Sequence, residues 1–105
     1  MFKKVKMKSL GEYIRFQRIS KKLLLRQVAA QLQIDPSLLS RIEAGVKRPT
    51  REQVIKLAAI LGVNREQLLV HYLSDRVVYE LKDEKLALKA MKAAERKITY
   101  IRRKG

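Results

Sequence analysis

The Asp35-Pro36 pair constrains the fold of this chain more than any other feature, because it fixes where a helix begins. Proline lacks a backbone N–H and holds φ near −65°, so it is tolerated at the first position of a helix but not further in. Aspartate is a favoured N-cap residue, whose carboxylate can accept from the free N–H groups of the new helix. A helix is therefore predicted to begin at Pro36, directly after a helix that Ala29 to Leu32 close.

The helix predicted over 36–44 has one apolar side and one small hydrophilic side. Leu38, Leu39 and Ile42 recur at helical spacing and are expected to face inward. The residues expected to face outward are Ser37, Ser40, Arg41 and Ala44. A helix with so little bulk and one guanidinium on its outer side fits a groove about 12 Å wide, such as the major groove of DNA.

With its surroundings, this segment resembles the phage-repressor-like (XRE-type) helix-turn-helix transcriptional regulators. The resemblance covers roughly residues 9–72. It is carried by Leu10, Ile14, Arg18, Val28, Ala29, Ile34, Leu39, the run Ser40-Arg41-Ile42-Glu43-Ala44-Gly45, Pro49 and the helix that begins at Arg51. It implies an all-α fold, with a five-helix lambda-repressor-like DNA-binding domain at 9–73.

The sequence departs from the family pattern in two places. Leu24 and Leu25 stand where the first helix of the motif often opens with a capping Ser or Thr followed by Gln. Pro36 stands where many relatives carry a base-reading polar side chain, so direct readout is expected to shift to Ser37, Ser40 and Arg41.

The candidate contacts to the DNA backbone lie on either side of this helix. Arg26 and Gln27 are candidates because they lie at a helix start, where backbone N–H groups also point outward. The loop after Gly45 adds the cations Lys47, Arg48 and Arg51. Such a loop suits phosphates, and the alternative is a solvated surface loop.

Arg18 falls on the buried side of the helix predicted from Ser9 to about Lys21. A cation there needs a partner, and the resemblance implies that this partner is Glu43, in a structural ion pair.

Capping patterns mark the remaining helices. Ser9 with Glu12, Thr50 with Gln53, and Asn64 with Gln67 predict three helix starts, and Gly45 and Gly62 predict two helix ends. The helix after Thr50 has an inward face of Val54, Leu57, Ala58 and Leu61. The helix after Asn64 is predicted to be short and to complete the domain at residue 73, with Leu68, Leu69 and Tyr72 turned inward.

The composition changes at Ser74, where a C-terminal extension over 74–105 is predicted to be helical. Ser74-Asp75 is expected to cap a short segment to about Leu81, and Asp83 to start a long helix to about Arg103. An apolar stripe follows the long helix at spacings of three and four: Ala87, Ala90, Met91, Ala94, Ile98 and Ile101. The stripe could pack back over the domain, or it could form a dimer interface through Met91, Ala94, Ile98 and Ile101.

A dimer suits DNA recognition, because two recognition helices related by a dyad read a palindrome with half-sites about one turn apart. The basic end of the long helix, which carries Arg96, Lys97, Arg102, Arg103 and Lys104, is by default a solvated face. It could also attract DNA or graze a membrane, but the small apolar face provides little insertion energy.

The net charge of +15 points to a polyanionic partner, with double-stranded DNA first and an acidic membrane surface second. The chain has no Cys and no apolar run near the roughly 20 residues needed to span a bilayer. Residues 1–8, with four lysines, are expected to be a basic arm, either a solvated tail or a contact to phosphates, and not a secretory signal. A cytoplasmic protein of a bacterium or phage, associated with the nucleoid when bound to DNA, is expected.

An enzyme is the least favoured class. His71 is the only histidine, and the ten acidic residues are spread along helices, so neither catalytic residues nor a metal or cofactor site is expected. A sequence-specific DNA-binding regulator is favoured. The alternative is an antitoxin or a restriction-modification controller, whose C-terminal half binds a protein partner.

Overall fold

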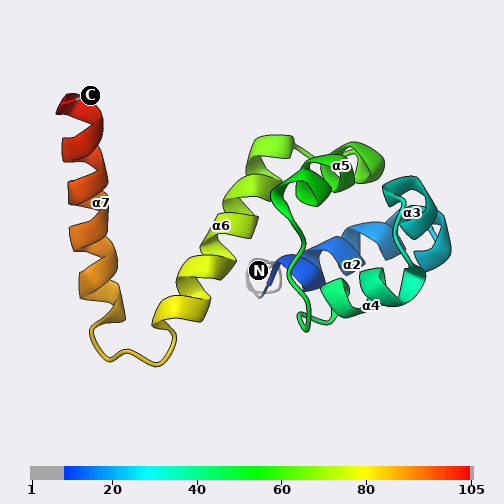
Figure 1. The fold of residues 1–105 in the computed structure, drawn as a ribbon, viewed down its shortest axis with the longest axis horizontal. Helices are drawn as coiled ribbons and strands as arrows, with labels where there is room; N and C mark the ends of the chain where they lie inside the picture. The colour runs from blue at the N-terminus through cyan, green and yellow to red at the C-terminus, as the bar shows by residue number, and fades with distance from the viewer. Residues whose placement is uncertain (1–8, 105) are drawn as a thin grey trace. The chain divides into compact units, whose positions relative to one another are not determined.

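The computed structural model describes residues 9–104, and over that range its regular secondary structure consists of α-helices joined by turns and loops (Figure 1). The helices are α2 (Leu10–Ser20), α3 (Leu25–Leu32), α4 (Pro36–Glu43), α5 (Arg51–Leu61), α6 (Arg65–Leu81) and α7 (Ala87–Lys104). The expected all-α fold, a helix-turn-helix domain with a C-terminal helical extension, is confirmed. The predicted basic arm at 1–8 lies outside the described residues.

Side-chain caps begin three of these helices where the sequence predicts them. Ser9 Oγ accepts from the backbone N–H of Glu12 at 3.2 Å, and Asn64 Oδ1 accepts from that of Gln67 at 2.8 Å. At α5 the cap is reciprocal: Thr50 Oγ1 accepts from Gln53 N at 3.1 Å, and Gln53 Oε1 accepts from Thr50 N at 2.9 Å. These bonds satisfy N–H groups that have no partner within the helix.

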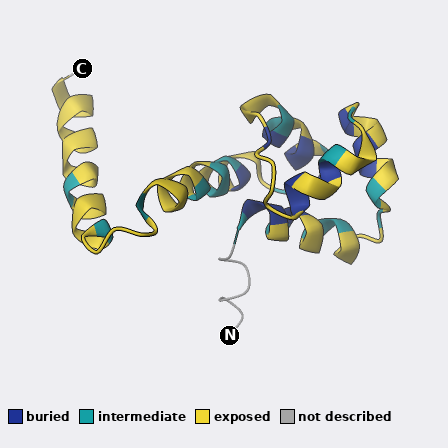
Figure 2. Cartoon of the chain, turned by 60° about the horizontal axis from the view of Figure 1, so that its bottom comes forward, coloured by how far each residue is buried: buried dark blue, intermediate teal, exposed yellow. Residues whose placement is uncertain are grey.

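The core lies among α2 to α5 and the first turns of α6, where the buried residues of Figure 2 are found. It consists of Leu10, Ile14, Val28, Ala29, Leu32, Leu39, Ile42, Val54, Leu57, Ala58, Leu61 and Leu68. The inward faces predicted for these helices are therefore largely correct. Leu38, Leu69 and Tyr72 are only partly buried and pack at the edge of this core.

Gly11 is buried at the crossing of α2 and α4. A Cβ atom at this position would lie 2.4 Å from the carbonyl oxygen of Ile42 and 2.6 Å from that of Glu43. Since both neighbours are backbone atoms at the end of a helix, neither can turn aside. The absence of a side chain at residue 11 therefore sets how closely α2 approaches the C-terminal end of α4.

The prediction of a short fifth helix followed by a new cap at Ser74-Asp75 is wrong. α6 runs without a break from Arg65 to Leu81, because this stretch contains neither Gly nor Pro to end it. Ser74 Oγ donates to the carbonyl of His71 within the same helix at 2.9 Å. The Asp75 carboxylate accepts instead from the backbone N–H of Leu10 at 3.0 Å, so it caps α2 rather than its own helix.

The chain divides into two units, Met1–Asp75 and Arg76–Gly105, and the division falls within α6. The second unit contains the last turns of α6, a turn over 82–86, and α7. Asp83 was predicted to start the long helix, but it lies in this turn. The helix begins at Ala87, four residues after Asp83. Within the turn, Glu84 N donates to Leu81 O at 2.9 Å and Ala87 N to Glu84 O at 3.2 Å. No residue of α7 is buried.

Candidate nucleic-acid interface

α3 and α4 are joined by a tight turn that depends on one unusual backbone conformation. Gln33 has φ 62° and ψ 43°, in the left-handed region, although it is not a glycine. Its N–H donates to Ala30 O at 3.1 Å and that of Ile34 to Ala29 O at 3.0 Å, which closes α3. Ile34 is partly buried and packs against the core, so the turn delivers the chain to Pro36 in a fixed direction.

α4 presents the hydrophilic side that the sequence predicts. Ser37, Ser40 and Arg41 are exposed, whereas Leu39 and Ile42 on the opposite side are 0% and 2% exposed. Apolar packing of the buried side therefore holds the helix in place. The exposed side is narrow because two of its three polar residues are serines. This is the shape that entry into a major groove requires.

The expectation that the Asp35 side chain caps α4 is wrong. Asp35 is the N-cap residue by position, but its side chain makes no capping hydrogen bond. Its carboxylate instead accepts from Ser37 Oγ at 2.7 Å. Because Pro36 carries no N–H, α4 has one donor fewer to satisfy at this end. The Ser37 hydroxyl, with its proton directed to Asp35, presents lone pairs outward and can accept from a base amino group.

Among residues 9–104, Glu43 at the end of α4 is the one charged residue that is buried. Arg18 Nε donates to Glu43 Oε2 at 2.7 Å, and a second guanidinium nitrogen donates to Oε1 at 3.0 Å. Arg18 also donates to the carbonyl of Leu23 at 2.9 Å. The structure thus brings together the two residues predicted to pair, in a bidentate geometry that joins α2, the α2–α3 loop and α4.

The hydrogen bonds that Arg18 donates to Glu43 raise the pKa of Arg18 above its ordinary value, against the opposing effect of burial. A guanidinium is already charged at every pH at which a protein folds, so Arg18 keeps its charge at neutral pH. The ion pair therefore positions α4 and is not a site of proton transfer.

Arg26 and Gln27, the candidate backbone contacts of α3, are both exposed at its first turn. The N-cap residue Leu24 has no side-chain acceptor, and the Gln27 side chain compensates: its Oε1 accepts from Leu24 N at 2.7 Å. This bond fixes the orientation of the amide group, and its NH2 can still donate to a phosphate oxygen.

The loop after α4 is anchored at both ends. Gly45 has φ 80°, and the N–H groups of Val46 and Lys47 both donate to the carbonyl of Arg41, at 2.9 and 3.2 Å. Pro49 is buried at the far end. Between these anchors Lys47 and Arg48 are exposed, and Arg51 is exposed at the start of α5. Two of the three predicted cations thus belong to a loop with fixed ends, and the third is the first residue of the helix that follows it.

Two contacts made by basic side chains of α2 and the residue after it were not predicted from the sequence. Arg15, which is 62% exposed, places its Nε 4.0 Å from Glu43 Oε1, so a second cation lies beside the end of α4. Lys21 Nζ donates to the carbonyl of Leu61, at the C-terminal end of α5. Both contacts depend on how helices cross, which helical periodicity does not report.

The residues predicted to form a dimer interface lie on α7, away from these contacts in sequence. Met91, Ile98 and Ile101 are 45%, 55% and 65% exposed, and Ala94 is also exposed. The structure describes a single chain, so these residues remain a prediction for the interface.

His71 and the acidic side chains do not gather into one site in the described part of the chain. Over residues 9–104 no group of three or more His, Asp or Glu side chains could hold a metal ion. His71 packs against Tyr13 with ring centroids 5.4 Å apart, and its Nδ1 lies 4.0 Å from Asp75. Within the same range no helix is both long and apolar enough to cross a bilayer.

The arrangement of α3, its turn and α4 defines a helix-turn-helix domain with an exposed second helix. The sequence model of the helix-turn-helix family matches residues 14–68, which include the whole motif and α5. The chain therefore belongs to this family, as an XRE-like helix-turn-helix DNA-binding regulator. No curated protein and no solved structure gives a significant match.

Proposed function

We propose that the protein is a sequence-specific transcriptional regulator that binds double-stranded DNA as a dimer, at a palindromic or pseudopalindromic operator. The observation that carries the proposal is the exposed Ser37, Ser40 and Arg41 side of α4, held in place by Leu39, Ile42 and the Arg18–Glu43 pair. Arg41 can bond to O6 and N7 of guanine, and the serines suit several base edges.

Contacts to phosphates would hold α4 in the groove. Arg26 and Gln27 at the start of α3 and the loop cations Lys47, Arg48 and Arg51 are the proposed groups. The dimer would use Met91, Ala94, Ile98 and Ile101 of α7, and two copies of α4 would then read two half-sites. We place this activity in the cytoplasm of a bacterium or phage-infected cell, with no enzymatic activity, metal or cofactor.

Replacing Arg41 by Ala tests base readout. After the preferred site is selected from random duplexes, Arg41→Ala should weaken binding to that site by about 1 to 3 kcal/mol, roughly 5- to 150-fold. Binding to unrelated DNA should change little, because the lost contact is to a base. Fluorescence anisotropy with both duplexes measures this. Arg65→Ala, at the exposed start of α6, is the matched control. An equal loss on both duplexes would reassign Arg41 to a phosphate.

Lys47→Ala tests the role of the loop. Removing one phosphate contact should weaken binding to every sequence and reduce the slope of log K against log salt concentration by about 1. The measurement is a salt titration from low to moderate ionic strength on specific and unrelated DNA. Lys56→Ala is the control, since Lys56 lies on α5 with Nζ 3.8 Å from Glu52. An unchanged slope for Lys47→Ala would remove the loop from the interface.

A second candidate function follows from the second unit of the chain. Its helix α7 has no buried residue, and its exposed apolar side chains include Leu88, Ile98 and Ile101. A surface of this kind could serve a protein partner, as expected of an antitoxin or a restriction-modification controller that also binds DNA. Co-purification of a stoichiometric partner encoded beside the gene would favour this function.

A further inference from the structure

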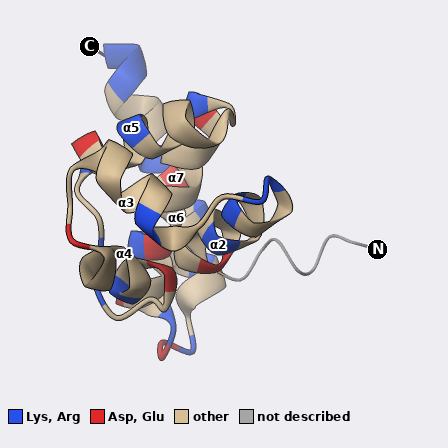
Figure 3. Ribbon diagram, turned by 90° about the vertical axis from the view of Figure 1, so that its right-hand side faces the viewer, with Lys and Arg blue, Asp and Glu red and all other residues tan. Residues whose placement is uncertain are grey.

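The cations of α7 gather on one side of the helix. At 3.6 residues per turn, this side covers about 140° of the helix circumference. We call it the basic face, and it consists of Lys89, Lys92, Arg96, Lys97, Arg103 and Lys104, all of them exposed. The last turn, with Arg102 beside the final two members, is the most basic part of the helix (Figure 3). Glu95, the only acidic residue of α7, lies outside the basic face.

The basic face opposes the stability of α7 in the single chain. Lys89 is followed by Lys92, and Lys92 by Arg96, at spacings of three and four residues, where like charges destabilise a helix. No residue of α7 is buried, so apolar packing does not offset this repulsion. A polyanion that lies along the basic face removes the repulsion and so stabilises the helix.

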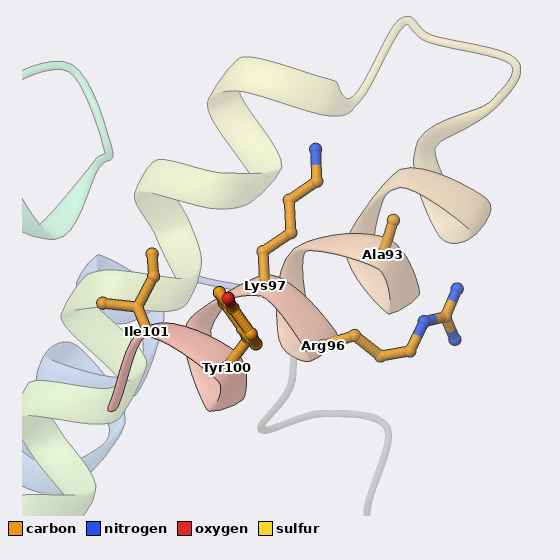
Figure 4. Close-up of a pocket in the computed structure, with 5 residues that line it drawn as sticks. All are labelled: Ala93, Arg96, Lys97, Tyr100 and Ile101. Carbon is orange, nitrogen blue, oxygen red and sulfur yellow. The ribbon is translucent and has the colours of Figure 1, made fainter. Parts of the chain in front are cut away.

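The middle of the basic face has room for a phosphate group. A shallow hollow there is lined by Ala93, Arg96, Lys97, Tyr100 and Ile101 (Figure 4). Ala93 adds only a methyl group to this surface, whereas the side chains of Arg96 and Lys97 extend away from the helix (Figure 4). Tyr100 is 63% exposed, and its hydroxyl can donate to a phosphate oxygen. The hollow thus combines two cations and a neutral donor.

We propose that the basic face of α7 binds the phosphate backbone of duplex DNA, on the same duplex that α4 reads. This proposal rests on the proposed function and extends DNA binding from the helix-turn-helix domain to the second unit of the chain. From Lys89 to Lys104 the basic face is roughly 22 Å long. A major groove is about 12 Å wide, so the face is long enough to reach phosphates on both edges of one groove.

Two observations favour DNA over the other large polyanion, an anionic membrane surface. The chain belongs to a family of DNA-binding domains, so a bound duplex brings phosphates to α7 at a local concentration in roughly the millimolar range. The apolar side of α7 consists of alanines with Met91, Ile98 and Ile101, and it has no Trp or Phe. Such a side contributes little insertion energy. It also lies apart from the basic face, so phosphate binding is compatible with the dimer proposed above.

Charge removal in the full chain tests the proposal. The triple variant Lys92→Gln, Arg96→Gln, Lys97→Gln removes three cations from the middle of the basic face, and glutamine preserves the helix. Each phosphate contact contributes about 0.9 to the slope of log K against log salt concentration, so the slope should fall by about 3. The measurement is a salt titration on a duplex of unrelated sequence, followed by fluorescence anisotropy. An unchanged slope would overturn the proposal.

A second triple variant separates the basic face from net charge. Lys82→Gln, Lys85→Gln, Arg102→Gln removes the same number of cations outside the basic face, two from the turn and one from the far side of α7. It should reduce the slope by less than about 1. An equal reduction in the two variants would show that only the overall charge matters, and the basic face would have no particular role.

Sequence preference distinguishes failure of this proposal from failure of the proposed function. The ratio of affinities for the selected site and unrelated DNA should be the same for the basic-face variant as for the unmodified chain, because phosphates carry no base information. If selection from random duplexes returned no preferred site, the proposed function would fail, while the salt slope would still report on the basic face.

Vesicles of phosphatidylserine and phosphatidylcholine provide the second probe. The full chain and the basic-face variant should differ much less in vesicle sedimentation than in DNA binding. If the variant lost vesicle binding and kept its slope on DNA, α7 would be a membrane-surface helix and the proposal would be wrong.

Discussion

Arg18→Met is expected to lower the free energy of unfolding by about 3 kcal/mol, the low end of the range for breaking a buried ion pair. The change leaves Glu43, whose side chain is 5% exposed, without the two hydrogen bonds that compensate its desolvation. Arg15 moderates the loss, because its Nε already lies 4.0 Å from the same carboxylate. Urea unfolding followed by circular dichroism measures the effect.

The double variant Arg18→Met with Glu43→Leu is the informative control. Because it removes both charges, it should recover most of the lost stability. The operator preference of the folded Arg18→Met protein should match that of the unmodified chain, since the ion pair positions α4 and does not read bases. A changed preference would contradict this assignment.

Gly11→Ala is expected to destabilise the domain by about 2 to 3 kcal/mol, although alanine is the better helix former by about 1 kcal/mol. The new methyl group would lie within 3 Å of the backbone of Ile42 and Glu43, so α2 and α4 would have to separate. Separation would also lengthen the contact between Arg18 and Glu43, which spans the same crossing. Thermal unfolding by circular dichroism measures the loss.

Phe16→Ala is the comparison for this prediction, because Phe16 lies on the same helix and is 60% exposed. It should change stability by much less than Gly11→Ala. If Gly11→Ala were neutral or stabilising, the crossing of α2 and α4 would be looser than the structure shows, and the close approach would have no energetic role.

The helix starts and the inward faces were predictable because they depend on local chemistry. Thr50 with Gln53, and Asn64 with Gln67, supply acceptors to nearby N–H groups whatever the rest of the chain does. Asp35 shows the limit of that reasoning. Its carboxylate could accept either from the backbone N–H groups of α4 or from the Ser37 hydroxyl, and it accepts from the hydroxyl. Residue type alone does not rank these two local hydrogen bonds.

The sequence predicted which side chains of α4 are exposed, but it did not predict which residues of other helices lie beside them. Helical periodicity correctly placed Ser37, Ser40 and Arg41 outward. The proximity of Arg15 to Glu43 follows from the way that α2 and α4 cross. Spacing along one helix carries no information about it.

The sequence by itself determined the helical class, the position of the motif and its outward face, because caps, breakers and apolar spacing act over a few residues. Only the tertiary structure decided that Asp75 caps α2 across 65 residues, and that Gly11 allows the close crossing of α2 and α4. It also showed that α6 continues through Ser74 to Leu81. The first two depend on atoms far apart in the chain, and so does the third, because the Asp75 carboxylate that could cap a new helix bonds to the N–H of Leu10 instead.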